Sequence, residues 1–229
     1  MIFLKKPFVY INAAMSLDGK ISTIERRQVR ISSDRDMSRV DALRASSDAV
    51  LVGKNTLITD DPKLTVKSSA LREERIKKGL PANPLKVALG CINELNIDSD
   101  FLNHGQAGKI LFTTSKSDNL KIDELKTKAT VYVSSEDEIN LDYVLETLYK
   151  LGVRRLMVEG GGRTIYRFLA AGVVDEVYVC VAPIIYGGED APTLVDGAGF
   201  TSDNAIKLEL FSMEKEGSEL VLKYRVLDA

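Results

Sequence analysis

The chain alternates short apolar segments with amphipathic ones along most of its length, and this alternation limits the folds open to it. The apolar segments are rich in β-branched and aromatic residues, as strands are. Seven of them are predicted to be strands: 8–14, 49–53, 85–89, 109–114, 130–135, 154–159 and 175–183. Helical spacing predicts helices over about a dozen residues from near Asp34, over 141–152 and within 161–172. Because strands that alternate with helices form βαβ units, we expect an α/β fold with a mainly parallel sheet.

Local signals at the helix ends support these predictions. Ser33 and Asp36 resemble a capping box at the start of the first helix. Asn140 is predicted to cap the helix over 141–152, and Gly152 is predicted to end it. The most charged stretch, 71–81, is predicted to be a solvated helix followed by a turn.

The C-terminal part has a different pattern. Residues 205–213 and 218–226 alternate apolar and polar side chains, and a Glu-Lys-Glu-Gly link at 214–217 separates them. This pattern predicts an antiparallel hairpin, so the sheet is expected to be mixed. No internal repeat, low-complexity tract or linker interrupts the sequence, and we expect one domain over residues 1–229.

Composition narrows the class of protein. The 229 residues include 31 basic and 33 acidic ones, without the basic excess typical of nucleic-acid-binding proteins. The N-terminal apolar run is interrupted by Lys5, Lys6, Asn12 and Asp18, so neither a signal peptide nor a membrane span is predicted. We expect a cytoplasmic protein with neither a nucleic acid nor a membrane as a partner.

Few residues suit metal or nucleophilic chemistry. His104 is the only histidine, and its place in a polar loop favours a solvated side chain over a catalytic base. Cys91 and Cys180 are far apart in the sequence and lie at or beside predicted strands. They are expected to be small buried side chains, not metal ligands or a disulfide, and no metal site is predicted.

The strongest local signal is Glu159-Gly160-Gly161-Gly162, between a predicted buried strand and a helix. Three glycines let the backbone approach a ligand closely, and the helix that follows offers free N–H groups to an anion such as a nucleotide pyrophosphate. The glycines lack the G-x-G-x-x-G spacing, and a tight turn without a ligand explains them equally well. Glu159 favours the ligand site, because a carboxylate at the C-terminal end of a strand usually faces the ligand crevice.

Two further polar segments follow predicted strands on the N-terminal side. In the loop expected over 54–65, Thr56 and Asp60 are able to hydrogen-bond to ribose hydroxyls or amides, although Asp-Asp-Pro alone indicates only a turn. After the first strand, Asn12 suits recognition of a heterocycle and Lys20 suits a phosphate. A turn at Asp18-Gly19 explains the second segment without a ligand.

A last strand exit, 182–188, contains paired glycines. Polar or glycine-rich segments at the ends of several strands in one α/β domain fit a nucleotide-like cofactor and a polar substrate.

These segments, in this order, resemble one family, the reductases of riboflavin biosynthesis. The matching stretches span nearly the whole chain: MSLDGKIST, RISSDRDMSRVDALRASSDAVLVGKNTLITDDPKLTV, NPLKVAL, LMVEGGGRT and VVDEVYVCVAPIIYGGEDAPTLVDGAGF. The family includes stand-alone archaeal and fungal enzymes and the C-terminal half of the bacterial bifunctional deaminase–reductase. The last stretch is most similar to the archaeal form, and the zinc-deaminase signature H-x-E…P-C-x-x-C is absent, which favours a lone reductase.

The resemblance implies a fold, an activity and an assembly. Family members have a dihydrofolate-reductase-like three-layer sandwich with a mixed sheet, and they form homodimers. They reduce the ribosylamino side chain of a pyrimidine 5′-phosphate to a ribitylamino group with NADPH, which we expect to proceed by hydride transfer to C1′ of the ring-opened imine. The archaeal and fungal substrate is the 2,5-diamino-6-ribosylamino-4(3H)-pyrimidinone 5′-phosphate, whereas the bacterial substrate is already deaminated. The sequence leaves open which substrate is used and whether NADH replaces NADPH.

The resemblance also implies site residues on the cofactor side. The expected cofactor contacts are Thr56, Asp60, Cys91, Ser135, Gly160, Gly161, Gly162, Arg163 and Thr164. Many relatives have Asp after the strand equivalent to 85–89, whereas this chain has Gly90, so a contact made by that carboxylate is absent here.

On the substrate side the resemblance implies binding residues and catalytic residues. The expected binding residues are Asn12, Ser16, Arg44, Leu64 and Lys67, and the expected catalytic residues are Asp18, Lys20 and Glu159. Lys20 and Arg44 are expected to hold the 5′-phosphate. Asp18 is the best side-chain candidate for the proton donor, with a substrate group or water as alternatives. Lys67 stands about where the bacterial form has a phosphate-binding arginine, and lysine keeps the charge without the bidentate geometry.

Two other functions stay open. A dihydrofolate reductase or another pterin-type reductase would have the same fold, but the absence of tryptophan and the SLDGK motif argue against it. A non-catalytic nucleotide-binding module would bind NADPH without turnover on any pyrimidine.

Overall fold

The computed structural model describes residues 5–227. The chain divides into two compact units, one of residues 5–8 and 41–157 and the other of residues 9–40 and 158–227. Helix α1 (Asp34–Ser46) and strand β6 (Arg155–Gly160) each contribute residues to both units. A single domain over residues 1–229 stays a prediction.

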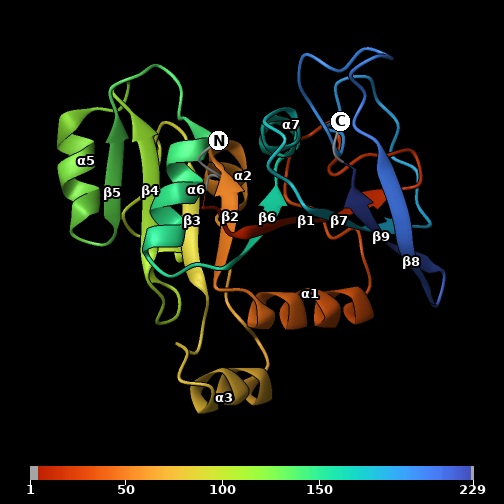
Figure 1. Ribbon diagram of the computed structural model, residues 1–229, viewed down its shortest axis with the longest axis horizontal. Helices are drawn as coiled ribbons and strands as arrows, with labels where there is room; N and C mark the ends of the chain where they lie inside the picture. Colours follow the sequence, from red (N-terminus) through yellow and green to blue (C-terminus); the bar gives the residue numbers. More distant parts are fainter. Residues whose placement is uncertain (1–4, 228–229) are drawn as a thin grey trace. The chain divides into compact units, whose positions relative to one another are not determined.

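Four parallel strands form the sheet of the first unit, in the order β5-β4-β3-β2. Their bounds are Ala49–Gly53 for β2, Leu85–Leu89 for β3, Lys109–Thr114 for β4 and Thr130–Ser134 for β5. The helices of this unit are α2 (Lys54–Asp60), α3 (Ser69–Lys77), α4 (Asp100–Asn103), α5 (Asn119–Lys126) and α6 (Leu141–Lys150). Figure 1 shows α5 beside β5, at the edge of this sheet. Every residue of β2 is buried, as parallel strands in α/β sheets are.

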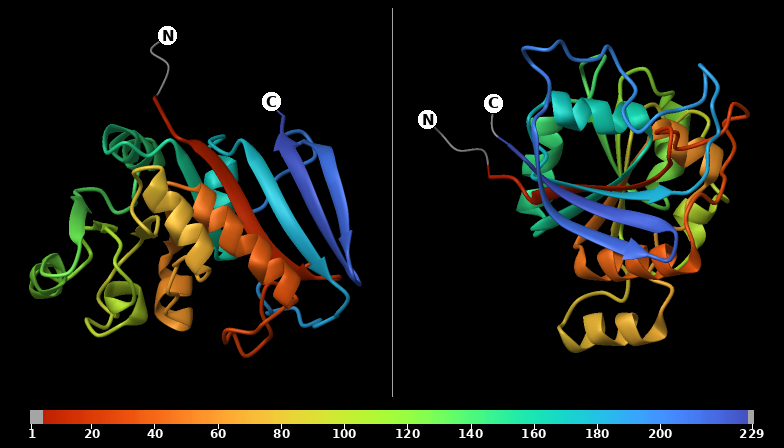
Figure 2. Two further views of the ribbon diagram at one scale, coloured as in Figure 1. Left: turned by 90° about the horizontal axis from the view of Figure 1, so that it is seen from below. Right: turned by 90° about the vertical axis from the view of Figure 1, so that its right-hand side faces the viewer.

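The second unit has a mixed sheet. Strand β1 (Phe8–Ser16) pairs in parallel with β7 (Glu176–Ala182), and β7 pairs antiparallel with β9 (Glu219–Val226). Strand β9 also pairs antiparallel with β8 (Leu208–Glu216), and Figure 2 shows these two as a long blue hairpin. Helix α7 (Gly162–Ala170) belongs to this unit. The expected α/β fold with a mixed, mostly parallel sheet and a C-terminal antiparallel hairpin is confirmed.

Three element predictions were wrong in detail. Strand β8 extends to Glu216, so the expected link at 214–217 is a two-residue turn, Gly217–Ser218, in which Gly217 has a φ of +63°. The expected loop after β2 begins with helix α2, whose Leu57 is buried. Helices α4 and α5 are present where the sequence pattern predicts no helix.

The predicted cap of α6 is present, whereas only one of the two hydrogen bonds of the predicted capping box forms at α1. Asn140 Oδ1 accepts the Tyr143 N–H at 3.1 Å, which confirms the cap of α6. At α1, Ser33 Oγ accepts the Asp36 N–H at 3.4 Å, but the Ser33 N–H donates to Glu219 Oε1 at 2.6 Å and not to Asp36. The Asp36 carboxylate instead pairs with Arg39 at 2.7 Å, so the reciprocal half of the capping box is absent.

Helix α3 is mostly exposed, as predicted for a solvated helix, but Arg75 is an exception at 3% exposure. Its Nη1 donates to the carbonyl oxygens of Ala45 and Ser47, each at 2.7 Å, and its Nε donates to the Pro81 carbonyl at 2.8 Å. These bonds compensate the burial of the guanidinium and connect α3 with the C-terminal end of α1.

Within residues 5–227 no helix is long and apolar enough to span a membrane. The same residues contain no group of three or more His, Cys, Asp or Glu side chains arranged to bind a metal ion.

Candidate active site

The predicted site residues divide between the two units, and each set is described within its own unit. In the first unit, the parallel strands β2, β3 and β5 end at the same edge of the sheet. Thr56 lies in the helix after β2, Cys91 follows β3 and Ser135 follows β5. The C-terminal edge of a parallel sheet is where α/β proteins bind ligands, so these three positions suit a cofactor groove.

Contacts between α2 and the end of β3 fix part of this edge. A Cβ added at Gly90 would lie 2.6 Å from Lys54 Cβ, so the two segments meet with no room for a side chain. Lys54 Nζ pairs with Glu94 Oε1 at 2.6 Å, and this hydrogen bond raises the pKa of Lys54. At the other end of α2, burial raises the pKa of Asp60.

Cys180 and His104 are placed as expected, whereas the expected burial of Cys91 was wrong. Cys180 is buried, and burial raises the pKa of its thiol. Cys91 is only half-buried, and its Sγ accepts a weak hydrogen bond from Ser117 Oγ at 3.5 Å. His104 is exposed at the C-terminal end of α4, as a solvated residue is.

Three of the predicted substrate residues of the first unit are brought together by α1. Arg44 Nη1 donates to the Thr65 carbonyl at 3.3 Å, next to Leu64. Asp41 accepts the Lys67 N–H at 2.6 Å, which holds the same segment from the other side. Leu64 is fully buried, with a φ of +47°, whereas the Lys67 side chain is exposed.

In the second unit, Ser16, Asp18 and Lys20 form a compact turn after β1. Ser16 is fully buried, and its hydroxyl donates to Asp18 Oδ1 at 2.6 Å and accepts the Lys20 N–H at 2.9 Å. Asp18 also accepts the N–H groups of Tyr186 and Gly187, at 3.2 Å and 2.7 Å. These bonds, the one from Ser16 foremost, lower the pKa of Asp18 and join the segments after β1 and β7.

Asn12 lies farther back along β1, facing Tyr178 of β7 in the strand register. It is 5% exposed, and its Oδ1 is buried without a hydrogen-bond partner within the described chain. A buried amide oxygen in that state is available to a donor group of a ligand.

The glycine turn connects β6 to α7. Glu159 is half-buried near the end of β6, and Gly160 ends the strand with a φ of +117°, a conformation that glycine adopts without strain. Gly161 is the N-cap of α7 and makes no side-chain capping bond. Its carbonyl accepts the N–H groups of Thr164 and Ile165, so the first turn of the helix is well formed.

Some residues that contact the predicted site residues were not themselves predicted from the sequence. Nothing in the sequence pattern distinguishes Asp41 from other helix residues. In the structure its carboxylate accepts the N–H groups of Lys67 and Ser68, which lie next to α1 only in the folded chain. Thr193 and Asp196 lie in the last stretch that carries the family resemblance, but no role is predicted for either, and they pack directly against Gly162. Only the tertiary structure shows either arrangement.

The chain belongs to the RibD C-terminal domain family, whose model matches residues 7–222, and the predicted family is thereby confirmed. It is 44% identical over 195 residues to the 2,5-diamino-6-ribosylamino-4(3H)-pyrimidinone 5′-phosphate reductase of Archaeoglobus fulgidus, covering 85% of this chain and 89% of that one. It is 38% identical over 222 residues to the protein of the same name from Methanothermobacter thermautotrophicus, covering 96% and 99%.

Solved structures show the same fold. A pyrimidine reductase-like protein from Corynebacterium diphtheriae matches with a TM-score of 0.83 at 19% identity, over 97% of this chain and 93% of that one. The bifunctional deaminase–reductase of Thermotoga maritima matches with a TM-score of 0.78 at 24% identity, over 97% of this chain but only 57% of its own length. The chain thus has the fold of these reductases and corresponds to part of the bifunctional protein.

Proposed function

We propose that this chain reduces the ribosylamino side chain of 2,5-diamino-6-ribosylamino-4(3H)-pyrimidinone 5′-phosphate to the ribitylamino product, with NADPH as the reductant. The observation that supports this most is the 44% and 38% identity, over most of both chains, to two reductases named for that substrate. Both are stand-alone proteins of about this length, which favours the diamino substrate over the deaminated one.

The glycine turn of the second unit fits the diphosphate of a dinucleotide. Gly161, the N-cap of α7, has no side chain to cap the helix, and the positive end of the helix dipole lies at this turn, where an anion is stabilised. Gly160 and Gly161 are the glycines that we assign to a close approach of an anion to the backbone, and Arg163 is exposed beside them. When bound, a reduced nicotinamide supplies the hydride.

On the substrate side, Lys20 is the residue we assign to the 5′-phosphate. One of its three N–H donors binds the Ala191 carbonyl at 3.0 Å, which fixes the ammonium while two donors are left for phosphate oxygens. Asn12 and Glu159 are assigned to orient the base or the ribose. The assignments of Arg44, Leu64 and Lys67 rest on the family resemblance.

We assign Asp18 to holding the turn, in place of the proton transfer that the sequence suggests for it. A general acid must be protonated near neutral pH, whereas the hydrogen bonds from Ser16, Gly187 and Tyr186 lower the pKa of Asp18. The proton at the imine nitrogen is therefore assigned to water or to a group of the substrate.

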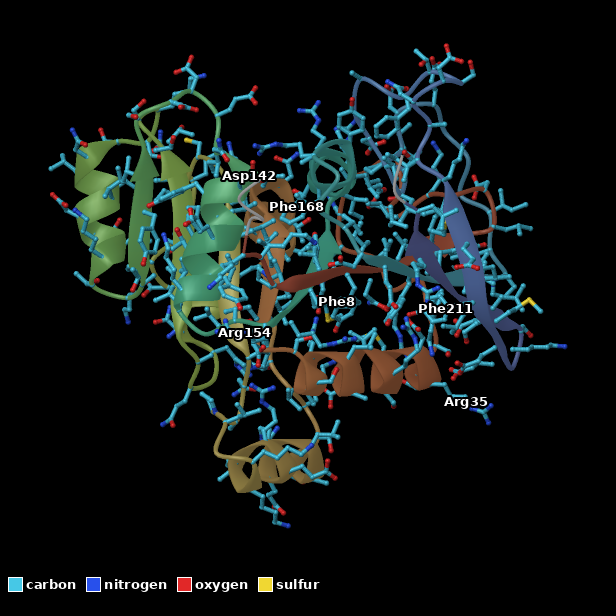
Figure 3. All side chains as sticks on the ribbon, in the orientation of Figure 1. Phe8, Arg35, Asp142, Arg154, Phe168 and Phe211 are labelled. Carbon is cyan, nitrogen blue, oxygen red and sulfur yellow. The ribbon has the colours of Figure 1, made fainter. Side chains whose placement is uncertain are left out.

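We further propose that the protein is a homodimer joined through the β8–β9 hairpin. Strand β8 is the edge strand of its sheet, and an edge strand is a template for pairing. Apolar side chains on it are exposed, from 41% for Leu208 to 64% for Met213, and Figure 3 labels another of them, Phe211, on this hairpin. A second copy of the same strand would cover both the unpaired backbone groups and these side chains.

The proposed reaction is tested by following the oxidation of NADPH with three substrates side by side. The diamino pyrimidinone phosphate is expected to be turned over far faster than its deaminated form, and dihydrofolate is expected to give no oxidation. Oxidation with dihydrofolate alone would identify a pterin reductase. Tight NADPH binding without turnover of either pyrimidine would identify a binding module.

A further inference from the structure

The segment 191–196 of the second unit lies between two features to which the proposed function assigns ligands. On one side it pairs with the turn after β1, through an isolated antiparallel bridge between Thr193 and Lys20. The Ile21 N–H donates to the Pro192 carbonyl at 2.9 Å, and the Leu194 N–H donates to the Gly19 carbonyl at 3.1 Å. The backbone on both sides of Lys20 is thereby fixed to this segment.

On its other side the segment touches the first residue of α7. A Cβ added at Gly162 would lie 2.5 Å from the Thr193 carbonyl oxygen and 2.7 Å from Asp196 Oδ2. Real Cβ atoms do not approach other atoms so closely, so the glycine is required by this contact.

Asp196 fixes the conformation of Thr193, the residue that contacts both Lys20 and Gly162. Its carboxylate accepts the Thr193 N–H, with both oxygens at 3.2 Å, and also the Thr193 hydroxyl. Hydrogen bonds to an ionised acceptor are about twice as strong as neutral ones. Thr193 is therefore held with its backbone paired to Lys20 and its carbonyl against Gly162.

We infer that Asp196, acting through Thr193, is a positioning residue that keeps Lys20 and the first turn of α7 in a fixed spatial relation. This inference rests on the proposed function, in which Lys20 binds the substrate phosphate and the glycine turn binds the dinucleotide. Hydride transfer requires the two reacting atoms to be aligned closely, so a device that fixes both binding groups contributes to the rate.

The decisive variant is Asp196→Ala, compared with Asp196→Asn and with Asp190→Asn as the matched control. Asp190 is an exposed acid in the same loop, and its carbonyl, not its carboxylate, contacts Arg26. We expect Asp196→Ala to raise both the Kd for NADPH and the KM for the pyrimidine phosphate about 10-fold. Asparagine keeps one acceptor oxygen and should restore part of each loss, and Asp190→Asn should match the unmodified protein.

Hydrogen exchange gives a readout that is independent of activity. In Asp196→Ala, the backbone amides at 19–21 and at 162–165 are both expected to exchange faster, because both contact the released segment. If the unmodified protein binds NADPH but reduces no pyrimidine, the proposed function is wrong. The positioning role of Asp196 is then still tested by comparing hydrogen exchange and NADPH binding of Asp196→Ala with those of the unmodified protein.

Two outcomes would overturn the inference. One is a lower Tm for Asp196→Ala with Kd, KM and exchange at both segments unchanged, which is the behaviour of a merely structural residue. The other is a change confined to one of the two ligands. If Asp196→Ala does not fold, Thr193→Val and Thr193→Ser replace it, because serine keeps the hydroxyl that Asp196 accepts and valine does not. Equal effects of valine and serine would then contradict the inference.

Discussion

At the scale of single residues, Lys86 of β3 shows how a buried charge is accommodated. Its side chain is completely buried, and Nζ donates to the carbonyl oxygens of Phe101 at 2.9 Å and His104 at 2.8 Å. The ammonium also lies 5.7 Å from the centre of the Phe101 ring. The last carbonyl groups of a helix have no N–H partner within the helix, and at the C-terminal end of α4 the Lys86 ammonium supplies hydrogen bonds to two carbonyls.

Burial lowers the pKa of Lys86 to about 8, with repulsion from Lys109 as a smaller cause and attraction to Asp100 and Asp61 acting against it. The unfolded chain therefore binds more protons than the folded one between about pH 8 and pH 10.5, and stability contributed by this group rises with pH across that window. We predict that the free energy of unfolding, relative to that of Lys86→Met, increases by on the order of 1–2 kcal/mol over the window.

Urea unfolding at several pH values measures this difference. The control is Lys150→Met, because Lys150 is exposed and paired only with Glu146 on α6. A difference between unmodified protein and Lys86→Met that stays flat or falls with pH would contradict the account.

Gly90 is a second residue whose role depends on its surroundings. Its φ of +133° and the 2.6 Å that would separate an added Cβ from Lys54 Cβ leave no room for a side chain at this position. We predict that Gly90→Ala lowers the free energy of unfolding by about 1–3 kcal/mol more than Gly152→Ala does. Gly152 also has a positive φ, +93°, but a Cβ there would meet nothing within 4 Å. Thermal unfolding of both variants gives the comparison, and equal losses would show that the contact with Lys54 is unimportant.

At the scale of elements, the strands were predictable and the short helices were not. Strands β2, β3 and β4 have the bounds expected from their continuous apolar runs, because a parallel strand buried on both faces needs such a run. Helix α2 was expected to be a loop, since Thr56, Thr59 and Asp60 favour turns, but burial of Leu57 against the sheet outweighs those local preferences.

The candidate site was predictable in part: its local motifs were recognised from the sequence, and its long-range contacts were not. The glycine turn and the polar residues after β1 form short motifs at strand ends, and such local motifs can be recognised from the sequence alone. Other contacts of the site join segments that are remote in the chain. Asp18 accepts hydrogen bonds from the Tyr186 and Gly187 N–H groups, and Asp196 contacts Gly162. Such contacts depend on the fold and leave no local pattern.

Helix α3 provides a prediction at this scale, because its buried Arg75 donates to three carbonyl groups outside the helix. Arg75→Met removes these donors and leaves buried carbonyls unpaired, so we predict a loss of about 2–4 kcal/mol in unfolding free energy. Limited proteolysis should show faster cleavage within 69–81. Lys77→Met, at an exposed position of the same helix, should change neither quantity. Cleavage unchanged in Arg75→Met would contradict this role.

At the scale of the whole molecule, the edge strand β8 leads to a prediction about assembly. Sedimentation equilibrium of the unmodified protein at micromolar concentration is expected to give a dimer. Met213→Lys places a charge among the exposed apolar side chains of the hairpin, so we predict a shift to monomer. Leu151→Lys, at a 53% exposed position after α6, is the control and should remain dimeric. A monomeric unmodified protein would disprove the hairpin interface.

In the proposed reaction, the hydride of NADPH is transferred to the sugar carbon of the pyrimidine substrate. The most direct measurement uses NADPH with deuterium at both hydrogen positions of the nicotinamide C4 and locates the label in the product by mass spectrometry and NMR. We predict one deuterium, at C1′ of the ribitylamino chain and at no ring position. Deuterium on the pyrimidine ring, or a reduced product without any label, would contradict it.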